Sequence, residues 1–377
     1  MSSKWAKTAG GPSSFDLRSD TMTTPNFAML AAIQNCSLDD DVMREDGDTN
    51  ELERYMAELT GKESSLFVLS GTMGNQLGLR SLLTQPPYAV LADSRAHILN
   101  YESSSVSSMA GALLVSATAS NNVHLTLEDI KRRVSLSDDV HTCPTRVISL
   151  ENTLNGMLFP LDEIKRISAF ARENDIKMHC DGARLWEAAA AGAGSLKELC
   201  EPFDTVTMCF SKGLGAPVGA ILVGSAANIK HARWVRKAIG GGVRQPGLLT
   251  AAARVAVDQT FGAGPNGEGG KLQGTHKVAK QVEKMWTAVG GTVMSPVHTN
   301  MVWLDLDAIG CPAADFVEIL KEQGLKTFGP RLVVHYQVAE NAEEVLKRLE
   351  VAFAKTMAKY KNAAATSNGP GNMYSST

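Results

Sequence analysis

The stretch TVTMCFSKGLGAPVGAILVG, residues 205–224, decides the fold class, because two short apolar runs flank a glycine-rich turn with a single lysine. We expect strands at 205–209 and 220–224. Lys212 then lies just beyond the carboxyl end of the first strand, where α/β proteins form their ligand sites. A lysine among small, partly apolar neighbours can form a Schiff base with a planar aldehyde. A surface lysine in a glycine-rich turn is the alternative.

Outward from this stretch, apolar runs alternate with helical patterns. The other predicted strands are 65–69, 89–93, 112–116, 145–150 and 177–180, and the predicted helices are 50–60, 74–83, 126–134, 161–174 and 228–239. Strands separated by helical stretches of about 10–15 residues are typical of βαβ units. The pattern predicts a large α/β domain over residues 15–260 with a mostly parallel seven-stranded sheet.

A composition shift follows this domain, since FGAGPNGEGG at 261–270 indicates a loop or hinge. Beyond it the pattern predicts a smaller C-terminal α+β domain over residues 261–364. Its expected elements are helices at 271–289, 313–323 and 342–360 and strands at 301–306 and 332–336. Residues 1–14 and 365–377 are rich in serine and glycine and are expected to form a flexible arm and tail.

Composition limits the functions that the chain could have. With 37 basic and 40 acidic residues, the net charge of −3 is too balanced to indicate a nucleic-acid or anionic membrane surface. No apolar run approaches the roughly 18–20 residues that span a bilayer, and the first 14 residues lack an apolar signal segment. The six cysteines are scattered without a CxxC pair, and no set of metal ligands is indicated. We therefore expect a cytoplasmic protein without nucleic-acid or membrane partners.

A second strand end carries an acid. In KMHCDGARLW, residues 177–186, Asp181 ends a short apolar strand and precedes Arg184. A carboxylate in this position could pair with the pyridinium nitrogen of pyridoxal phosphate (PLP). The alternative is that Asp181 caps the following helix.

A possible phosphate site follows another strand. In LFVLSGTMGNQ, residues 66–76, a strand passes through Ser70, Gly71 and Thr72 into a helix, a geometry that presents backbone N–H groups to a phosphate. His97, just past the strand 89–93, could stack on an aromatic ring. Arg184 and Arg331 could grip a substrate carboxylate with two hydrogen bonds, or serve as ion-pair partners.

Together these motifs resemble the threonine aldolases, which are PLP enzymes of fold type I. The similar segments, all in family order, are FDLRSDTMTTP (15–25), LDDDVMREDGDTNELE (38–53), ELTGKESSLFVLSGTMGNQ (58–76), HILNYE (97–102), ENTLNG (151–156), HCDGARLW (179–186), FSKGLGAP (210–217) and GGGVRQPG (240–247). The resemblance covers residues 15–355, nearly the whole chain.

The resemblance implies that Lys212 bonds PLP, that Asp181 meets the pyridine nitrogen and that His97 stacks on the ring. The other residues that it implies are Ser70, Gly71, Thr72 and Arg244 near the phosphate, Arg184 beside the cofactor, and Ser19, Arg184 and Arg331 at the substrate carboxylate. It also implies a homodimer or homotetramer whose active sites use both subunits.

The chain departs from the family pattern beside the substrate side chain. Where many members read DDVYGED, this chain has Met43 and Arg44 in place of tyrosine and glycine. In ENTLNG, Leu154 and Asn155 replace the histidine that is thought to handle the β-hydroxyl. A histidine from elsewhere, such as His124 or His335, would restore that base.

These departures leave two activities open. The first is PLP-dependent cleavage of L-threonine, L-allo-threonine or a related β-hydroxy-α-amino acid to glycine and an aldehyde. The second is an alanine racemase activity, known among fungal relatives of the family, with a place in a specialised-peptide pathway. A small apolar pocket built by Met43 and Leu154 would suit alanine.

Overall fold

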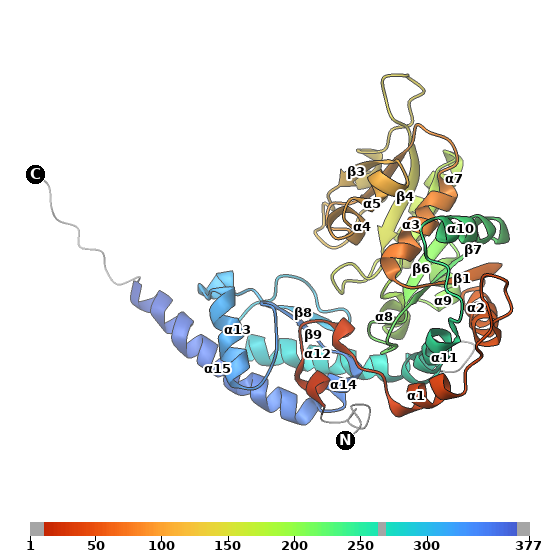
Figure 1. The fold of residues 1–377 in the computed structure, drawn as a ribbon. Coiled ribbons are helices and arrows are strands. Elements are labelled where there is room, and N and C mark those ends of the chain that lie inside the picture. The colour runs from red at the N-terminus through yellow and green to blue at the C-terminus, as the bar shows by residue number, and fades with distance from the viewer. Residues whose placement is uncertain (1–10, 263–268, 368–377) are drawn as a thin grey trace, which may run out of the picture. The chain divides into compact units, whose positions relative to one another are not determined.

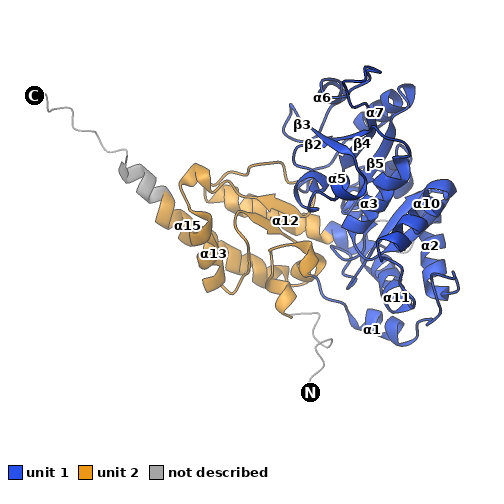
Figure 2. Cartoon of the chain, turned by 45° about the horizontal axis from the view of Figure 1, so that its top comes forward, with its two compact units in different colours: residues 1–6, 23–273 blue, residues 7–22, 274–377 orange. Residues whose placement is uncertain are grey.

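The computed structural model describes residues 11–262 and 269–367, and the chain forms two compact units. Unit 1 comprises residues 1–6 and 23–273, and unit 2 comprises residues 7–22 and 274–377 (Figure 2). Within the described ranges, every helix falls short of the combination of length and apolar character that crossing a bilayer requires.

Unit 1 is built on a seven-stranded sheet with the order β1-β7-β6-β5-β4-β2-β3 (Figure 1). Its strands are β1 (Ser64–Val68), β2 (Ala89–Asp93), β3 (Leu113–Ala117), β4 (Thr145–Glu151), β5 (Lys177–Asp181), β6 (Thr205–Cys209) and β7 (Ala220–Gly224). Strands β2 to β6 pair in parallel, and only β7 runs antiparallel to its neighbours. The predicted fold class is confirmed, and each predicted strand of this sheet exists within one residue of its expected bounds.

Helices cover both faces of this sheet, as its nearly continuous apolar strands require. Leu66, Val68 and Leu222 are fully buried together with residues of α3 (Gly71–Leu82) and α10 (Ala226–Ala238). Met178 and Met208 point to the other face, where the larger core includes residues of α2 (Gly47–Thr60) and α7 (Leu161–Glu173). The remaining helices of this unit are α1 (Phe27–Gln34), α4 (His97–Asn100), α5 (Ser105–Met109), α6 (Leu127–Lys131), α8 (Leu185–Ala190), α9 (Leu196–Cys200) and α11 (Gly247–Ala256).

Unit 2 has a small antiparallel sheet of β8 (Met301–Trp303) and β9 (Arg331–Val333). Its helices are α13 (Ala313–Glu322), α14 (Tyr336–Ala339), α15 (Ala342–Ser367) and most of α12 (Gly270–Ala288). Its core contains Trp286, Phe316 and Phe353, with Trp286 edge-on to both phenylalanine rings. All three predicted helices and both predicted strands exist here, although both strands end earlier than expected.

The unit bounds differ from the predicted domain bounds. The boundary lies at 273/274, inside α12, rather than at 261, where residues 263–268 are outside the described range. Residues 15–22 belong to unit 2 because Leu17 donates its N–H to the Lys326 carbonyl at 2.8 Å and accepts from Val333 N–H at 2.9 Å. Backbone pairing of this kind is invisible in a local sequence pattern.

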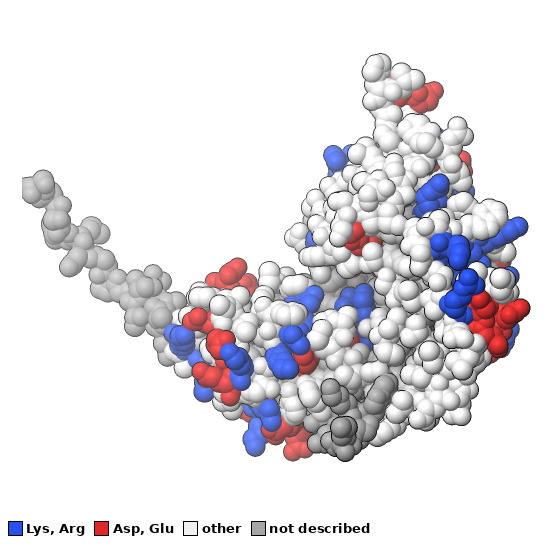
Figure 3. All heavy atoms as spheres, viewed as in Figure 1, with Lys and Arg blue, Asp and Glu red and all other residues white. Residues whose placement is uncertain are grey.

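The predicted arm and tail fall mostly on residues 1–10 and 368–377, which lie outside the described range. Where the arm is described, Ser13 and Ser14 are buried in a 3-10 helix, Pro12–Phe15, and so are not loose. On the face drawn in Figure 3, acidic side chains lie beside basic ones on both units.

Candidate active site

The candidate site of unit 1 lies at one edge of its sheet, because parallel strands end together. Glu151 ends β4 and Asp181 ends β5, while Lys212 follows β6 and His97 follows β2. The predicted positions of Lys212, Asp181 and His97 relative to their strands are therefore correct.

Glu151 connects these groups electrostatically. It is the register partner of Asp181. Burial and the nearby Asp181 carboxylate raise the pKa of Glu151 to about 8, and the charges of Lys212 and Arg184 lower it in part. These opposing influences indicate two acidic and two basic groups gathered at one place.

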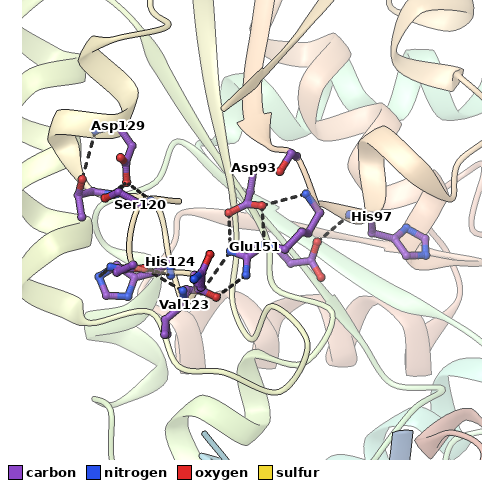
Figure 4. Close-up of polar contacts among 12 residues, drawn as sticks. Asp93, His97, Ser120, Val123, His124, Asp129 and Glu151 are labelled. Atoms are coloured by element: carbon purple, nitrogen blue, oxygen red, sulfur yellow. Dashed lines mark hydrogen bonds and ion pairs between the residues drawn. The ribbon is translucent and has the colours of Figure 1, made fainter. Parts of the chain in front are cut away.

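His97 is held by two carboxyl groups. Its backbone N–H donates to Glu151 Oε2 at 2.8 Å (Figure 4), and its ring Nδ1 lies 2.9 Å from Glu102 Oε1. The His97 side chain is 40% exposed, whereas the Glu102 side chain is fully buried. One ring nitrogen of His97 is therefore engaged by Glu102, and part of the ring remains exposed.

The Lys212 turn is fixed by its backbone. The Lys212 carbonyl accepts from Thr23 Oγ1 at 2.9 Å and from the Gly215 N–H at 3.0 Å. A Cβ at Gly213 would lie 2.7 Å from Glu187 Oε1, a buried carboxylate. Glycine at 213 therefore leaves room for the Glu187 carboxyl group beside the lysine turn.

Helix α3 provides the candidate phosphate site. Ser70 is its N-cap, and its hydroxyl accepts from the Met73 N–H at 3.1 Å. The N–H groups of the first turn, including those of Gly71 and Thr72, have no carbonyl partner within the helix, and they carry the positive end of its dipole. An anion is stabilised in such a position.

Glycines bring α3 against the sheet. A Cβ at Gly71, Gly74 or Gly78 would lie 2.5–2.8 Å from the side chain of Cys209, Thr207 or His179, respectively. The spacing of three and four residues puts these glycines on one helix face. The helix can therefore lie close enough for its polar side chains to reach Asp181.

Sequence analysis missed a polar network at this contact. Asn75 donates to Asp181 and to Glu102, and His179 bonds Asn75 and Thr205. Asn75, Glu102 and His179 all lie in motifs quoted above. The available signal was the alternation of His179 and Asp181 on one face of β5, opposite a helix with glycines at positions 71, 74 and 78.

The predicted carboxylate and phosphate residues are only partly brought together. Arg184 lies in unit 1, and its charge acts on Glu151. Ser19 and Arg331 belong to unit 2, where Arg331 donates to the Arg18 carbonyl at 3.0 Å. Arg244 forms an ion pair with Asp40 and its side chain is 63% exposed. The predicted roles of all four residues stay predictions.

The apolar pocket predicted for Met43 and Leu154 is not formed by the two residues within this chain. Met43 is 65% exposed, whereas Leu154 is buried and lines a small hollow with Glu151, His124 and Phe159. The His124 ring lies 5.0 Å from the Phe159 ring. Figure 4 shows His124 on the opposite side of Glu151 from His97.

His335, the other histidine considered as a replacement base, lies in unit 2. It is buried there, and its Nε2 lies 3.1 Å from the Asp16 carbonyl oxygen. Burial lowers the pKa of His335, so the neutral ring donates this hydrogen bond. This geometry gives His335 a structural role in holding the N-terminal segment.

The residues at the sheet edge fit pyridoxal phosphate. A lysine, a carboxylate two strands away from a partly exposed histidine ring, and a helix N-terminus offer partners for the aldehyde, pyridine nitrogen, ring and phosphate of that group. Thr207 Oγ1, beside Asp181 in register, is buried and has no hydrogen-bond partner among the described residues. An unpartnered buried hydroxyl next to the acid is expected where a polar ligand completes the site.

Comparisons with known proteins agree with this chemistry. The beta-eliminating lyase family matches residues 16–309. The chain is 49% identical to the aldolase vrtJ of Penicillium aethiopicum, over 89% of this chain and 85% of that protein. It is 44% identical to the alanine racemase TOXG of Cochliobolus carbonum, over 89% and 86%.

A threonine aldolase is also among the relatives. The low-specificity L-threonine aldolase of Eremothecium gossypii is 41% identical over 96% of this chain and 92% of that protein. Among solved structures, the Leishmania major threonine aldolase superposes with a TM-score of 0.73 at 19% identity, covering 91% of this chain and 99% of that one. The latter similarity concerns the fold alone.

Proposed function

Because the chain belongs to the beta-eliminating lyase family, and with it to the threonine aldolases, we propose that it cleaves a β-hydroxy-α-amino acid to glycine and an aldehyde. It is a PLP-dependent lyase. The proposed substrates are L-threonine, L-allo-threonine or a related amino acid with a β-hydroxyl group.

Residues of unit 1 would hold the cofactor. Lys212 would bond its aldehyde carbon, Asp181 would accept a hydrogen bond from the pyridine N–H, and His97 would cover one ring face. Ser70, Gly71 and Thr72 would bind the phosphate through the start of α3. When bound, PLP accepts the electron pair of whichever Cα bond is broken.

The observation that carries the proposal is the pairing of His97 with Glu102 at 2.9 Å. A carboxylate that accepts from Nδ1–H leaves the other ring nitrogen, Nε2, as a proton acceptor and stabilises the imidazolium that forms. His97 is therefore proposed to take the proton of the β-hydroxyl group. The Cα–Cβ bond then breaks, the aldehyde leaves, and Cα is protonated to give glycine.

The substrate carboxylate is proposed to bind Arg184, Ser19 and Arg331. Arginine matches a carboxylate with two parallel N–H···O bonds, which fixes the amino acid relative to the ring. We further propose that the enzyme is a cytoplasmic homodimer or homotetramer whose sites use both subunits, with Arg244 reaching a phosphate there.

Alanine racemisation is the second candidate, and the buried Leu154 favours it. Leucine cannot exchange a proton with a β-hydroxyl group, and its apolar side chain suits the methyl group of alanine. The relative TOXG is named an alanine racemase. If this candidate is correct, the enzyme would serve a specialised-peptide pathway.

One experiment separates the two candidates. The purified PLP-loaded protein is incubated with L-threonine, L-allo-threonine and L-alanine in turn, and acetaldehyde, glycine and D-alanine are measured. Equal amounts of acetaldehyde and glycine support the aldolase. D-alanine without acetaldehyde would support the racemase and contradict the aldolase. His97→Asn and His124→Asn are compared under the same conditions, and a larger loss of cleavage in the His124 variant would move the base to that residue.

A further inference from the structure

The buried amide of Asn75, on α3, is shared by two carboxylates. Its Nδ2 lies 2.9 Å from Asp181 Oδ2 and 2.8 Å from Glu102 Oε1. Ionised carboxylates only accept hydrogen bonds, so both N–H groups of the amide are used. The reverse orientation would put the amide oxygen against both carboxylates. The orientation of Asn75 is therefore determined by its partners.

The orientation of the Asn75 amide determines which ring nitrogen of His179 carries a proton. Asn75 Oδ1 lies 3.2 Å from His179 Nε2, so this ring nitrogen must carry a proton. The other ring nitrogen, Nδ1, lies 2.9 Å from Thr205 Oγ1. Because burial lowers the pKa of His179 to about 4, the ring is neutral and Nδ1 accepts from the threonine hydroxyl. The hydrogen bonds therefore run in one direction, from Thr205 through His179 and Asn75 to Asp181.

The amide also bridges the two carboxyl groups. One oxygen each of Asp181 and Glu102 and a ring nitrogen of His97 lie within 4.8 Å of one another. A donor placed between two carboxyl groups at this separation offsets the repulsion between their oxygens. The second oxygen of Asp181, Oδ1, accepts from the Ala183 N–H at 3.1 Å. Both oxygens of the acid are therefore held before any cofactor binds.

We propose that Asn75 is a positioning residue that holds the Asp181 carboxyl group oriented toward the pyridine nitrogen, and that His179 locks the Asn75 amide in the required orientation. The inference rests on the proposed PLP chemistry. The strength of the hydrogen bond between Asp181 and the pyridine nitrogen would then depend on a series of hydrogen bonds that begins with Thr205 on β6.

The first test uses the unmodified protein. With ¹⁵N-labelled histidine, the two ring nitrogens of His179 are distinguished by their chemical shifts, and a His179→Gln variant identifies the signal. A neutral ring with the proton on Nε2 is expected at pH 7, with and without PLP. A proton on Nδ1, or a charged ring, would reverse the donor chain and overturn the proposal.

The second test compares neighbouring residues. Asn75→Leu and Gln76→Leu each remove a buried amide that donates to Glu102, because Gln76 Nε2 lies 2.9 Å from Glu102 Oε2, but only Asn75 also donates to Asp181. Each protein is titrated with PLP, and the pyridine nitrogen of ¹⁵N-labelled PLP is observed by NMR.

Asn75→Leu is expected to weaken PLP binding by about ten- to a hundredfold, the effect of one lost charge-assisted hydrogen bond, and to shift the pyridine nitrogen toward its unprotonated value. Gln76→Leu is expected to keep the wild-type pyridine signal. Equal signals in both variants would overturn the proposal. Should Asn75→Leu fail to fold, the His179 tautomer still decides. If the wild type binds PLP but cleaves no amino acid, the proposed function fails and the positioning role is judged by these spectra alone.

Discussion

Glu151 and Asp181 are direct register partners at the carboxyl ends of β4 and β5, and burial next to Asp181 favours the protonated form of Glu151. Burial and the neighbouring charge raise the pKa of Glu151 to about 8, so this carboxyl keeps its proton at pH 7. Asp181 instead accepts hydrogen bonds from the Asn75 amide and the Ala183 N–H. The two carboxyl groups at this edge therefore differ, because Glu151 keeps its proton whereas Asp181 is held by two donors.

Because the two carboxyl groups differ, replacing each of them by the corresponding amide should have unequal effects on turnover. Asp181→Asn should retain some PLP but lose most turnover, because the pyridine nitrogen loses its charge partner. At pH 7, the factor by which kcat falls in Glu151→Gln should be at least about tenfold smaller than the factor in Asp181→Asn. The reason is that glutamine resembles a protonated glutamic acid. Steady-state kinetics of the two variants check this. Similar losses of kcat in both would contradict the protonated state of Glu151.

Lys212→Ala should abolish the visible absorption of the PLP-loaded protein, because no other lysine follows β6 at the site. Borohydride treatment of the wild type should fix PLP to the peptide that contains Lys212. Lys62→Ala is the control, since burial lowers the pKa of the Lys62 amine, which donates to the Phe203 carbonyl. Mass spectrometry that places the fixed cofactor on another lysine would exclude Lys212.

Arg331→Lys should lower kcat/KM about ten- to a hundredfold for every amino-acid substrate while the visible spectrum persists. A lysine lacks the planar fork, and one lost charge-assisted contact costs about 1.5–3 kcal/mol. Arg331 lies over the Trp303 ring and donates to the Arg18 carbonyl. Arg348→Lys is a matched control in unit 2, because Arg348 lies over the Phe15 ring and donates to the Gln323 carbonyl. Unchanged kinetics in Arg331→Lys would place the carboxylate site elsewhere.

Gly74→Ala should lower the free energy of unfolding by about 1–2 kcal/mol, because the added Cβ would lie 2.5 Å from Thr207 Cγ2 and overpacking outweighs the helix propensity of alanine. In Gly274→Ala, in α12, the added Cβ has no atom within 4 Å. This variant should raise the free energy of unfolding by about 0.5–1 kcal/mol. Urea unfolding measures both changes. A stabilised Gly74 variant would show that α3 can move away from the sheet.

His179 should make the protein less stable in acid. Its pKa is about 4 in the folded state and near its ordinary value of 6.5 when unfolded, so between these values the unfolded chain binds more protons. Stability therefore falls as the pH drops from 6.5 to 4, by at most about 3 kcal/mol. His179→Gln should lack this part of the loss. Glu151 acts in the opposite sense between pH 4.5 and 8, but it is present in both proteins, so their difference in urea unfolding isolates His179.

The parallel sheet could be predicted because its strands are apolar throughout and separated by helical patterns. The positions of Lys212 and Asp181 followed from the same pattern, since each ends or follows a strand. The network around Asn75 could not be predicted in this way. It depends on how closely α3 approaches β5 and β6, which is set by three glycines whose partners lie about 100 to 140 residues later in the sequence.

The assignment of residues 15–22 to unit 2 could not be predicted from the sequence either. Nothing in the local sequence distinguishes a segment that begins the large unit from one that pairs with distant strands. Leu17 is buried in the core of unit 2, and its partners, Lys326 and Val333, become evident only in three dimensions. The binding of the carboxylate by Ser19 and Arg331 therefore remains a prediction.

The backbone pairing of Leu17 also has a consequence for biosynthesis. Arg18 and Arg331, joined by a hydrogen bond, are 313 residues apart in sequence. On the ribosome, the segment that contains Arg18 is made before the seven strands of unit 1, and its partner Arg331 is made after them. Unit 1 can therefore form during translation, whereas unit 2 closes only after β9 has been made. Termination of translation between β7 and β9 would release a chain with a complete seven-stranded sheet and an unpaired Leu17 segment.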